Sequence, residues 1–203
     1  PDGWGFAFYL AQFPHLVRNA HQAHQDQLFR ELSAVVSTRT FIAHVRKATV
    51  GDVAILNCHP FQHGPWTFAH NGEIGGYAKH DAVRQRVRDL VEEPFRRHIL
   101  GSTDSEVMFH IFLSQLARQV DDVQNGGVTI RHATTALRET VATIRVITDD
   151  VSPSRLNVLL TNGNILLGYR HGRELFFSTH KTNCPERLTC QCFDENSCEK
   201  AVT

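Results

Sequence analysis

Residues 68–77 read FAHNGEIGGY, an apolar run that ends in the pair Asn71-Gly72 and continues into two further glycines. An Asn-Gly pair after an apolar run is the strongest short-range turn signal, because both residues tolerate a positive φ. A strand end that presents an amide side chain beside a glycine N–H can also direct two donors at a developing oxyanion. The sequence therefore allows two interpretations of this pair, a hairpin turn or an oxyanion-binding site.

The composition is that of a single soluble domain. The chain has 203 residues, of which 41% are hydrophobic, so it is long enough to bury most of its apolar surface. Its 21 basic and 21 acidic residues give a formal net charge of zero, which provides no electrostatic footprint for nucleic acid or an anionic membrane. No apolar stretch approaches the roughly 20 residues that span a bilayer, and the N-terminus has no signal pattern. We expect a cytoplasmic protein whose partner is a small molecule.

The chain is predicted to form one domain over residues 1–203, since it contains no repeat, Pro-rich linker or low-complexity tract. It begins with a turn that runs directly into an alternating strand, and it stops just after a cysteine-rich stretch. We therefore expect that a piece of the domain is missing at each end. No heptad seam or interface helix indicates an oligomeric state.

Apolar periodicity predicts an α+β fold. Alternating or short apolar runs predict strands at residues 5–10, 41–45, 67–69, 156–160, 165–169 and 174–178. Helical spacing predicts helices within residues 22–37, 83–91, 103–116 and 133–144, with Pro94 breaking or restarting the second. Thr103 and Glu106 have the spacing of a capping box, and Asn162-Gly163 has that of a two-residue hairpin turn. Because strands come early, helices follow and strands return, the sheets should be mainly antiparallel.

Several polar segments at the ends of these elements resemble, in their order, the class II glutamine amidotransferase domain of the N-terminal-nucleophile hydrolase superfamily. Within it they are most similar to the small bacterial type 2 amidotransferase-like proteins and the γ-glutamyl amide hydrolases of thiol metabolism. The stretches that carry the resemblance are DGWGFAFY (2–9), AHVRKATVG (43–51), NCHPF (57–61), WTFAHNGEIGGY (66–77), GSTDSEVMFHIFL (101–113) and LNVLLTNGNILLGYR (156–170). The resemblance implies a four-layer αββα sandwich.

The resemblance also implies site residues whose chemistry suits a glutamine-like substrate, which carries an α-carboxylate, an α-ammonium and a γ-amide. Arg46 would bind the carboxylate with its bidentate fork, and Asp104 would accept from the ammonium. The Asn71 side chain and the Gly72 backbone N–H would hold the tetrahedral oxyanion. We also expect His70 to be one of the substrate-binding residues. Taken singly, Arg46 could be a surface ion pair, Asp104 a helix cap and His70 a hydrogen-bonded core residue.

The nucleophile is the point at which the chain departs from the family. There it is an N-terminal cysteine whose α-amino group is the general base, and it precedes the stretch that matches residues 2–5. Residue 1 here is Pro1. We predict hydrolysis of glutamine or a γ-glutamyl amide through a cysteine thioester, with the nucleophile outside this chain. The alternative is a catalytically inactive amide-sensing module or a Cys/His metal-binding module. The leaving group stays open, as free glutamine, a γ-glutamyl amine and a γ-glutamyl thiol peptide all share the α-amino-acid end.

The five cysteines do not supply a clear nucleophile or metal site. Cys58 lies close to the site motifs but in the middle of the chain, where it is predicted to be a small, partly buried side chain. The other four, Cys184, Cys190, Cys192 and Cys198, could offer soft ligands to zinc. Their spacing does not follow the CxxC pairs of ordinary zinc sites. We therefore expect no metal and no cofactor.

Overall fold

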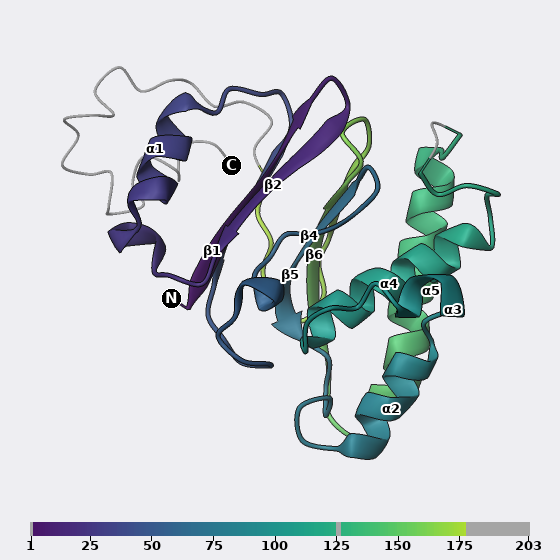
Figure 1. The fold of residues 1–203 in the computed structure, drawn as a ribbon. Coiled ribbons are helices and arrows are strands. Elements are labelled where there is room, and N and C mark those ends of the chain that lie inside the picture. Colours follow the sequence, from purple (N-terminus) through teal and green to yellow (C-terminus); the bar gives the residue numbers. More distant parts are fainter. Residues whose placement is uncertain (1, 125–126, 178–203) are drawn as a thin grey trace. The chain divides into compact units, whose positions relative to one another are not determined.

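The computed structural model describes residues 2–124 and 127–177. The part of the chain up to Arg173 clusters as one compact unit, and it contains all the helices and strands discussed below (Figure 1). Residues 174–177 belong to a second unit and adopt no regular structure. The strand predicted at 174–178 is therefore wrong over its described part. The prediction of one domain over residues 1–203 stays a prediction.

The N-terminal sheet has three antiparallel strands in the order β2-β1-β3. They are β1 (Gly3–Leu10), β2 (Phe13–Asn19) and β3 (Phe41–Arg46). The turn between β1 and β2 is Ala11-Gln12, and both residues have positive φ, 48° and 72°. Such values match the primed turns that follow the twist of a hairpin. Sequence reasoning missed β2 because this turn contains neither Asn nor Gly.

The C-terminal sheet has four antiparallel strands in the order β4-β5-β6-β7. They are β4 (Phe61–His63), β5 (Trp66–Glu73), β6 (Arg155–Thr161) and β7 (Leu166–Tyr169). Asn71 and Gly72 lie inside β5, where they pair with Asn157 and Leu156 of β6. The hairpin-turn interpretation of Asn71-Gly72 is therefore wrong. The hairpin predicted around Asn162-Gly163, in contrast, is present, although four residues, 162–165, connect β6 to β7 where a two-residue turn was expected.

Five α-helices complete the described fold: α1 (Gln27–Val35), α2 (Asp81–Asp89), α3 (Glu93–Arg96), α4 (Asp104–Ala117) and α5 (Ile130–Thr148). Pro94 lies in the first turn of α3, where its missing N–H removes no helical bond, so the helix restarts there. Thr103 caps α4 by accepting from the Glu106 N–H at 3.2 Å. The Glu106 carboxylate bonds to the N–H groups of Leu100 and Gly101, so only half of the predicted capping box forms. No helix among the described residues has the length and apolar character needed to cross a bilayer.

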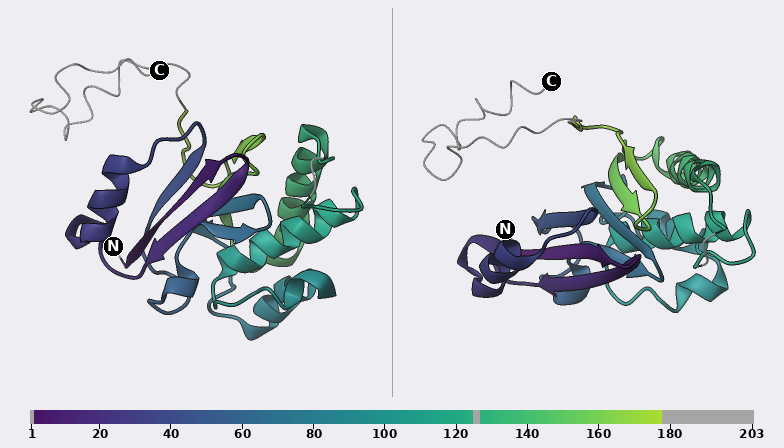
Figure 2. Two further views of the ribbon diagram at one scale, coloured as in Figure 1. Left: turned by 45° about the horizontal axis from the view of Figure 1, so that its top comes forward. Right: turned by 90° about the horizontal axis from the view of Figure 1, so that it is seen from above.

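The helices cover the two outer faces of the paired sheets (Figures 1 and 2). On the N-terminal sheet, Trp4 and Phe6 of β1 pack against Phe29 of α1. On the C-terminal sheet, the alternate residues of β5 face α4, and the ring of Phe68 stacks on Phe109 with centroids 5.2 Å apart. The predicted four-layer αββα sandwich is thus confirmed.

The inner faces of the two sheets approach very closely along β1. Successive side chains of a strand point to opposite faces, so Gly3, Gly5 and Ala7 face the C-terminal sheet. Trp4 and Phe6 face α1. A Cβ atom on Gly5 would lie 2.1 Å from the carbonyl oxygen of His59. At the other end of β1, the Tyr9 hydroxyl lies 2.7 Å from the Pro65 carbonyl oxygen. The small residues of β1 therefore set the spacing of the sandwich.

Replacing Gly5 with alanine should destabilise the fold by about 1–3 kcal/mol, because the added methyl group meets a backbone carbonyl that cannot move aside. The matched control is Gly127→Ala, since no atom lies within 4 Å of a Cβ placed at Gly127. That control should change stability by no more than about 0.5 kcal/mol. Urea unfolding of the two variants measures the difference. Equal stabilities would show that the sheets can separate without cost at Gly5.

Candidate active site

Arg46 ends β3 and faces the C-terminal sheet, and it is only 3% exposed. Its guanidinium donates to three successive carbonyl oxygens of the following loop, those of Val50 (2.9 Å), Gly51 (3.2 Å) and Asp52 (3.0 Å). The loop therefore folds around the cation. These contacts exclude the interpretation of Arg46 as a surface ion pair.

Asp104 is the first residue of α4 and is 2% exposed. One carboxylate oxygen accepts from the backbone N–H of Ser105 at 2.9 Å, and the other accepts from the N–H of Ile74 at 2.7 Å. Since Thr103 provides the helix cap, Asp104 is not the cap. It instead ties the start of α4 to the chain directly after β5, two residues beyond Gly72. This contact brings an acidic group to the end of the strand that carries the predicted oxyanion donors.

Asn57 links the Arg46 loop to the segment that leads into α4. Its amide nitrogen donates to the Asp52 carbonyl at 2.9 Å and lies 3.1 Å from the Ser102 hydroxyl oxygen, and its amide oxygen accepts from the Ser102 N–H at 2.8 Å. A chain of hydrogen bonds thus runs from Arg46 through the loop to the residues just before Asp104. Sequence reasoning did not assign a role to Asn57, although it lies within the NCHPF stretch.

Asn71 and Gly72 occupy the last part of β5. Asn71 is exposed, and by strand alternation it shares a face with Thr67, which contacts Tyr9 of the N-terminal sheet. A Cβ atom at Gly72 would lie 1.8 Å from the Arg155 carbonyl oxygen. The close packing against β6 is therefore sufficient to require glycine at this position, whatever its role in catalysis. Among the five predicted site residues, Asn71 is the exposed one, whereas Arg46, Asp104 and His70 are buried.

His70 faces the helical layer and is 2% exposed. One ring nitrogen lies 2.9 Å from the Ser105 hydroxyl oxygen, and the other lies 2.9 Å from the Arg155 carbonyl oxygen. Both nitrogens therefore already connect β5 to α4 and β6. This geometry is that of a hydrogen-bonded core histidine, and substrate binding by His70 stays a prediction.

Two further imidazoles, those of His44 and His59, lie between the sheets. The rings of His44 and His59 have centroids 4.3 Å apart, and neither ring nitrogen of buried His59 has a partner among the described residues. Burial lowers the pKa of His44 to about 4, and the positive charge of Arg46 acts in the same direction. Burial lowers the pKa of His59 well below its ordinary value. Both rings are therefore neutral at pH 7.

One of the five cysteines, Cys58, lies among the described residues. Cys58 is buried against the carbonyl oxygens of Asn19 and Ala54, and burial raises the pKa of its thiol. A protonated, buried thiol is a structural side chain, as predicted. The remaining cysteines, 184, 190, 192 and 198, lie outside the described residues. Within residues 2–124 and 127–177, no group of three or more His, Cys, Asp or Glu side chains could hold a metal ion.

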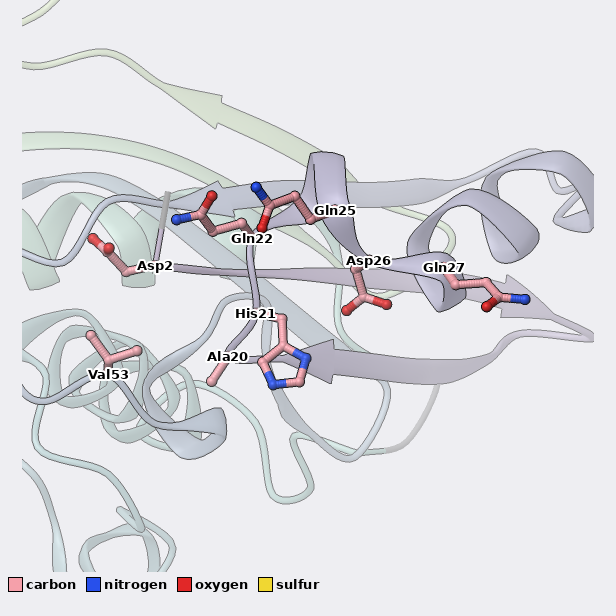
Figure 3. Close-up of a pocket in the computed structure, with 8 residues that line it drawn as sticks. All are labelled: Asp2, Ala20, His21, Gln22, Gln25, Asp26, Gln27 and Val53. Atoms are coloured by element: carbon pink, nitrogen blue, oxygen red, sulfur yellow. The ribbon is translucent and has the colours of Figure 1, made fainter.

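A polar cavity of about 520 Å³ lies beside the start of β1 (Figure 3). Its lining includes Asp2 and Val53 at one end and Gln25 and Asp26 toward the other. The Asp2 carboxylate also accepts from the N–H of Ala48 at 2.8 Å. The cavity thus adjoins the loop that Arg46 organises, although none of the five predicted site residues lines it.

The comparison with protein families identifies the chain. A sequence model described as "Glutamine amidotransferases class-II" matches residues 1–186. The chain belongs to this family. A probable glutamine amidotransferase of Saccharomyces cerevisiae is 29% identical over 188 residues, which cover 84% of this chain and 51% of that protein. A γ-glutamyl-hercynylcysteine sulfoxide hydrolase of Mycobacterium tuberculosis is 34% identical over 74 residues, 36% of this chain and 32% of that protein. The amidotransferase chain spans about half the length of the first curated relatives that it matches.

Solved structures agree with the family assignment. A glutamine aminotransferase class-II domain protein from Silicibacter pomeroyi matches with a TM-score of 0.61 and 26% identity, over 79% of this chain and 65% of that one. A protein from Pseudomonas aeruginosa, described as a predicted glutamine amidotransferase, matches with a TM-score of 0.55 and 27% identity, over 84% and 60%. The glutamine phosphoribosylpyrophosphate amidotransferase of Bacillus subtilis, at 17% identity, TM-score 0.50 and coverage of 80% and 29%, supports the fold alone.

The buried histidines should make the amidotransferase domain less stable as the pH falls from 6.5 towards 4. An unfolded histidine binds a proton near pH 6.5, whereas His44 in the fold does so only near pH 4. The unfolded chain then binds more protons, so the stability present above pH 6.5 decreases through this window. Urea unfolding between pH 7.5 and pH 4.5 measures the slope. His59→Phe should flatten it, while His15→Gln on the exposed surface of β2 should not. An equal slope in both variants would contradict the assignment.

Proposed function

We propose that this domain hydrolyses the γ-amide of glutamine or of a γ-glutamyl amide through a cysteine thioester, with the cysteine supplied from outside residues 1–203. One observation above all supports the proposal. The Asp104 carboxylate bonds to the N–H of Ile74, which places an acid at the end of the strand that bears Asn71 and Gly72. The family match over residues 1–186 supports the same reaction class.

In the proposed reaction, the cysteine sulfur attacks the γ-carbonyl carbon, and the α-amino group of the same cysteine takes up the thiol proton. The carbonyl oxygen becomes an oxyanion, which accepts hydrogen bonds from the Asn71 amide and the Gly72 N–H. The C–N bond then breaks, and the amino group returns the proton to the departing ammonia or amine. Water adds to the resulting thioester, which releases glutamate and regenerates the thiol.

Arg46 and Asp104 retain the capacity to bind the α-amino-acid end of a substrate. The guanidinium carries five N–H donors, and its contacts with three neutral carbonyl groups leave its positive charge uncompensated. The Asp104 carboxylate offers about four lone-pair positions, and the N–H groups of Ile74 and Ser105 together with the Ser105 hydroxyl leave one for an ammonium. These two groups select the amino-acid end and do not restrict the leaving group.

The inactive amide-sensing or metal-binding alternative is not favoured. The family match indicates an amidotransferase domain. The four cysteines on which the metal-binding alternative rested, 184, 190, 192 and 198, lie outside the described residues. For the whole protein, we propose a cytoplasmic enzyme that acts on a small glutamine-like molecule. It would have no nucleic-acid partner and no cofactor.

Arg46→Lys in the complete, cysteine-bearing protein should weaken binding of a glutamine analogue by about tenfold or more, because a point charge cannot reproduce a bidentate fork. The buried contacts with the 50–52 loop predict a lower melting temperature as well. Asn57→Ala is the control, because it loosens the same loop and keeps the cation. Calorimetric titration that finds unchanged affinity in Arg46→Lys, or equal losses in both variants, would remove Arg46 from the site.

Asn71→Ala should reduce turnover by about 100-fold or more, or roughly 2.7–4 kcal/mol of transition-state stabilisation, while ligand affinity changes little. Stability should also change little, because Asn71 is exposed and lies in no turn. Asn162→Ala is the matched control: its side chain accepts from two backbone N–H groups of a true Asn-Gly turn. It should lower the melting temperature and preserve turnover. Preserved turnover in Asn71→Ala would exclude Asn71 as an oxyanion donor.

A further inference from the structure

A second cavity, of about 380 Å³, has a lining that the proposed reaction does not use. It lies where β2, β4 and the N-terminal half of α4 meet, and its polar lining includes Arg18, His63, His98, Glu106 and His110. None of the residues assigned to substrate or oxyanion binding lines it. Its volume falls within the usual range for small-molecule sites, about 300–1,000 Å³.

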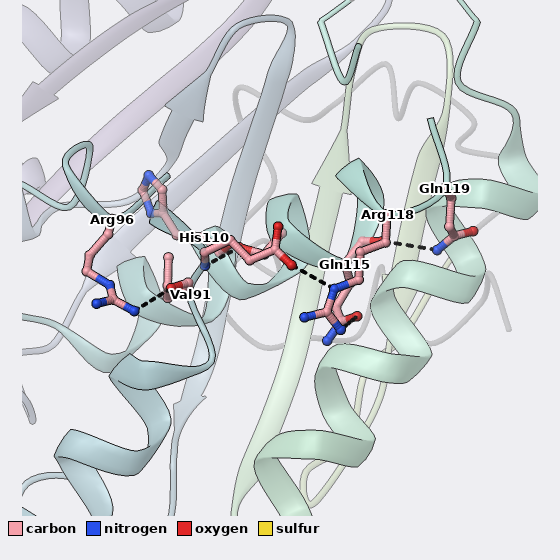
Figure 4. Close-up of polar contacts among 8 residues, drawn as sticks. Val91, Arg96, His110, Gln115, Arg118 and Gln119 are labelled. Carbon is pink, nitrogen blue, oxygen red and sulfur yellow. Dashed lines mark hydrogen bonds and ion pairs between the residues drawn. The ribbon is translucent and has the colours of Figure 1, made fainter. Parts of the chain in front are cut away.

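His110 provides a buried hydrogen-bond acceptor in this lining. It projects from α4 (Figure 4), is 2% exposed, and its Nδ1 atom lies 2.9 Å from the carbonyl oxygen of Glu106. A carbonyl oxygen only accepts, so Nδ1 carries the proton and Nε2 presents a lone pair. Burial lowers the pKa of His110 to about 4, which keeps the ring neutral. Nε2 has no partner among the described residues, and an unsatisfied buried acceptor costs about 1–3 kcal/mol.

Arg18 provides a cation whose fork is only partly used. Its Nη1 donates to the Cys58 carbonyl oxygen at 3.1 Å, and the described residues offer its other guanidinium nitrogens no hydrogen bond. The nearby Glu106 carboxylate is occupied instead by the N–H groups of Leu100 and Gly101, at 3.0 Å and 2.7 Å. Arg18 therefore retains donors for an anion, and a carboxylate matches the geometry of the fork.

Aromatic rings form part of the wall, beside Leu16, Leu56 and Leu100. The centroid of His63 lies 4.9 Å from that of His98 and 6.2 Å from that of His110, with interplanar angles of 72° and 78°. Phe61 also lines the cavity. Edge-to-face walls of this kind favour a flat ring over a flexible aliphatic chain.

We propose that this cavity is a second binding site, which takes a small planar heteroaromatic carboxylate with a ring N–H. The ligand carboxylate pairs with Arg18, its ring packs against His63 and Phe61, and its N–H donates to Nε2 of His110. The proposal is independent of the amide hydrolysis described above, because the two sets of residues do not overlap.

Pyrrole-2-carboxylate is a suitable probe, because it combines a flat ring, an N–H group and a carboxylate. We expect a saturable change in the Nε2 resonance of His110 in long-range proton–nitrogen spectra of the full protein labelled at histidine. Benzoate keeps the ring and carboxylate but lacks the N–H, so it should bind about tenfold more weakly. This ligand comparison needs no substitution. The absence of a saturable change, or equal affinity for both probes, would overturn the proposal.

Arg18→Gln tests the cation and should weaken pyrrole-2-carboxylate binding by about tenfold or more. Arg86→Gln removes an exposed arginine of α2 that lies outside the cavity and should leave binding unchanged. Melting temperatures of both variants establish that they are folded. Equal binding by folded Arg18→Gln would contradict the assigned carboxylate partner. If Arg18→Gln does not fold, the comparison of the two probes in the unsubstituted protein decides.

Discussion

The fold depends on the contact between Gly5 and the carbonyl oxygen of His59, where a Cβ atom would lie only 2.1 Å from that oxygen. From Gly3 to Phe8, β1 alternates glycine or alanine with large aromatic residues, so the bulk of this stretch lies on one face. Its large face packs under α1, and its flat face allows a second sheet to come close. The second sheet must then bury its own outer face under α4 and α5. The order of the layers thus follows from β1, whose two faces carry side chains of different size.

The same closeness assembles the candidate active site. Arg46 ends β3 of one sheet and Asn71 lies near the end of β5 of the other, and these two strands are in contact across the sandwich. Asn57 and Asp104 then connect the loops beyond these strands through backbone contacts. Most of the polar side chains in this region are therefore committed to holding loops, which is the arrangement that keeps a binding site rigid before a ligand arrives.

Sequence reasoning succeeded where local chemistry decides the structure. The helix that begins after Thr103 and the turn at Asn162-Gly163 both follow from short-range preferences. It failed at Asn71-Gly72, because pairing with a strand more than eighty residues away overrides the local turn preference. It also missed the turn at Ala11-Gln12, where the twist of two strands imposes positive φ on residues that do not favour it.

The candidate site shows a similar division. The identity of Arg46, Asn71 and Asp104 could be proposed from motifs that resemble a known family. Their partners could not, since Asn57 bonds to Ser102, 45 residues away, and nothing in either local sequence indicates that contact. Periodicity likewise did not indicate that His59 would be buried against His44, because His44 lies in β3 and His59 lies in the segment before β4.

Tyr9 holds the end of the sandwich opposite the candidate active site, with its hydroxyl beside oxygens of Pro65, Thr67 and Thr161. Burial raises the pKa of this phenol to about 12, whereas a tyrosine in water ionises near pH 10. A phenolate at this position would have no proton to donate to the carbonyl oxygens of Pro65 and Thr161. Ionisation is therefore coupled to separation of the two sheets at this end. The pH at which Tyr9 ionises therefore reports how tightly the two sheets are held together at this end of the sandwich.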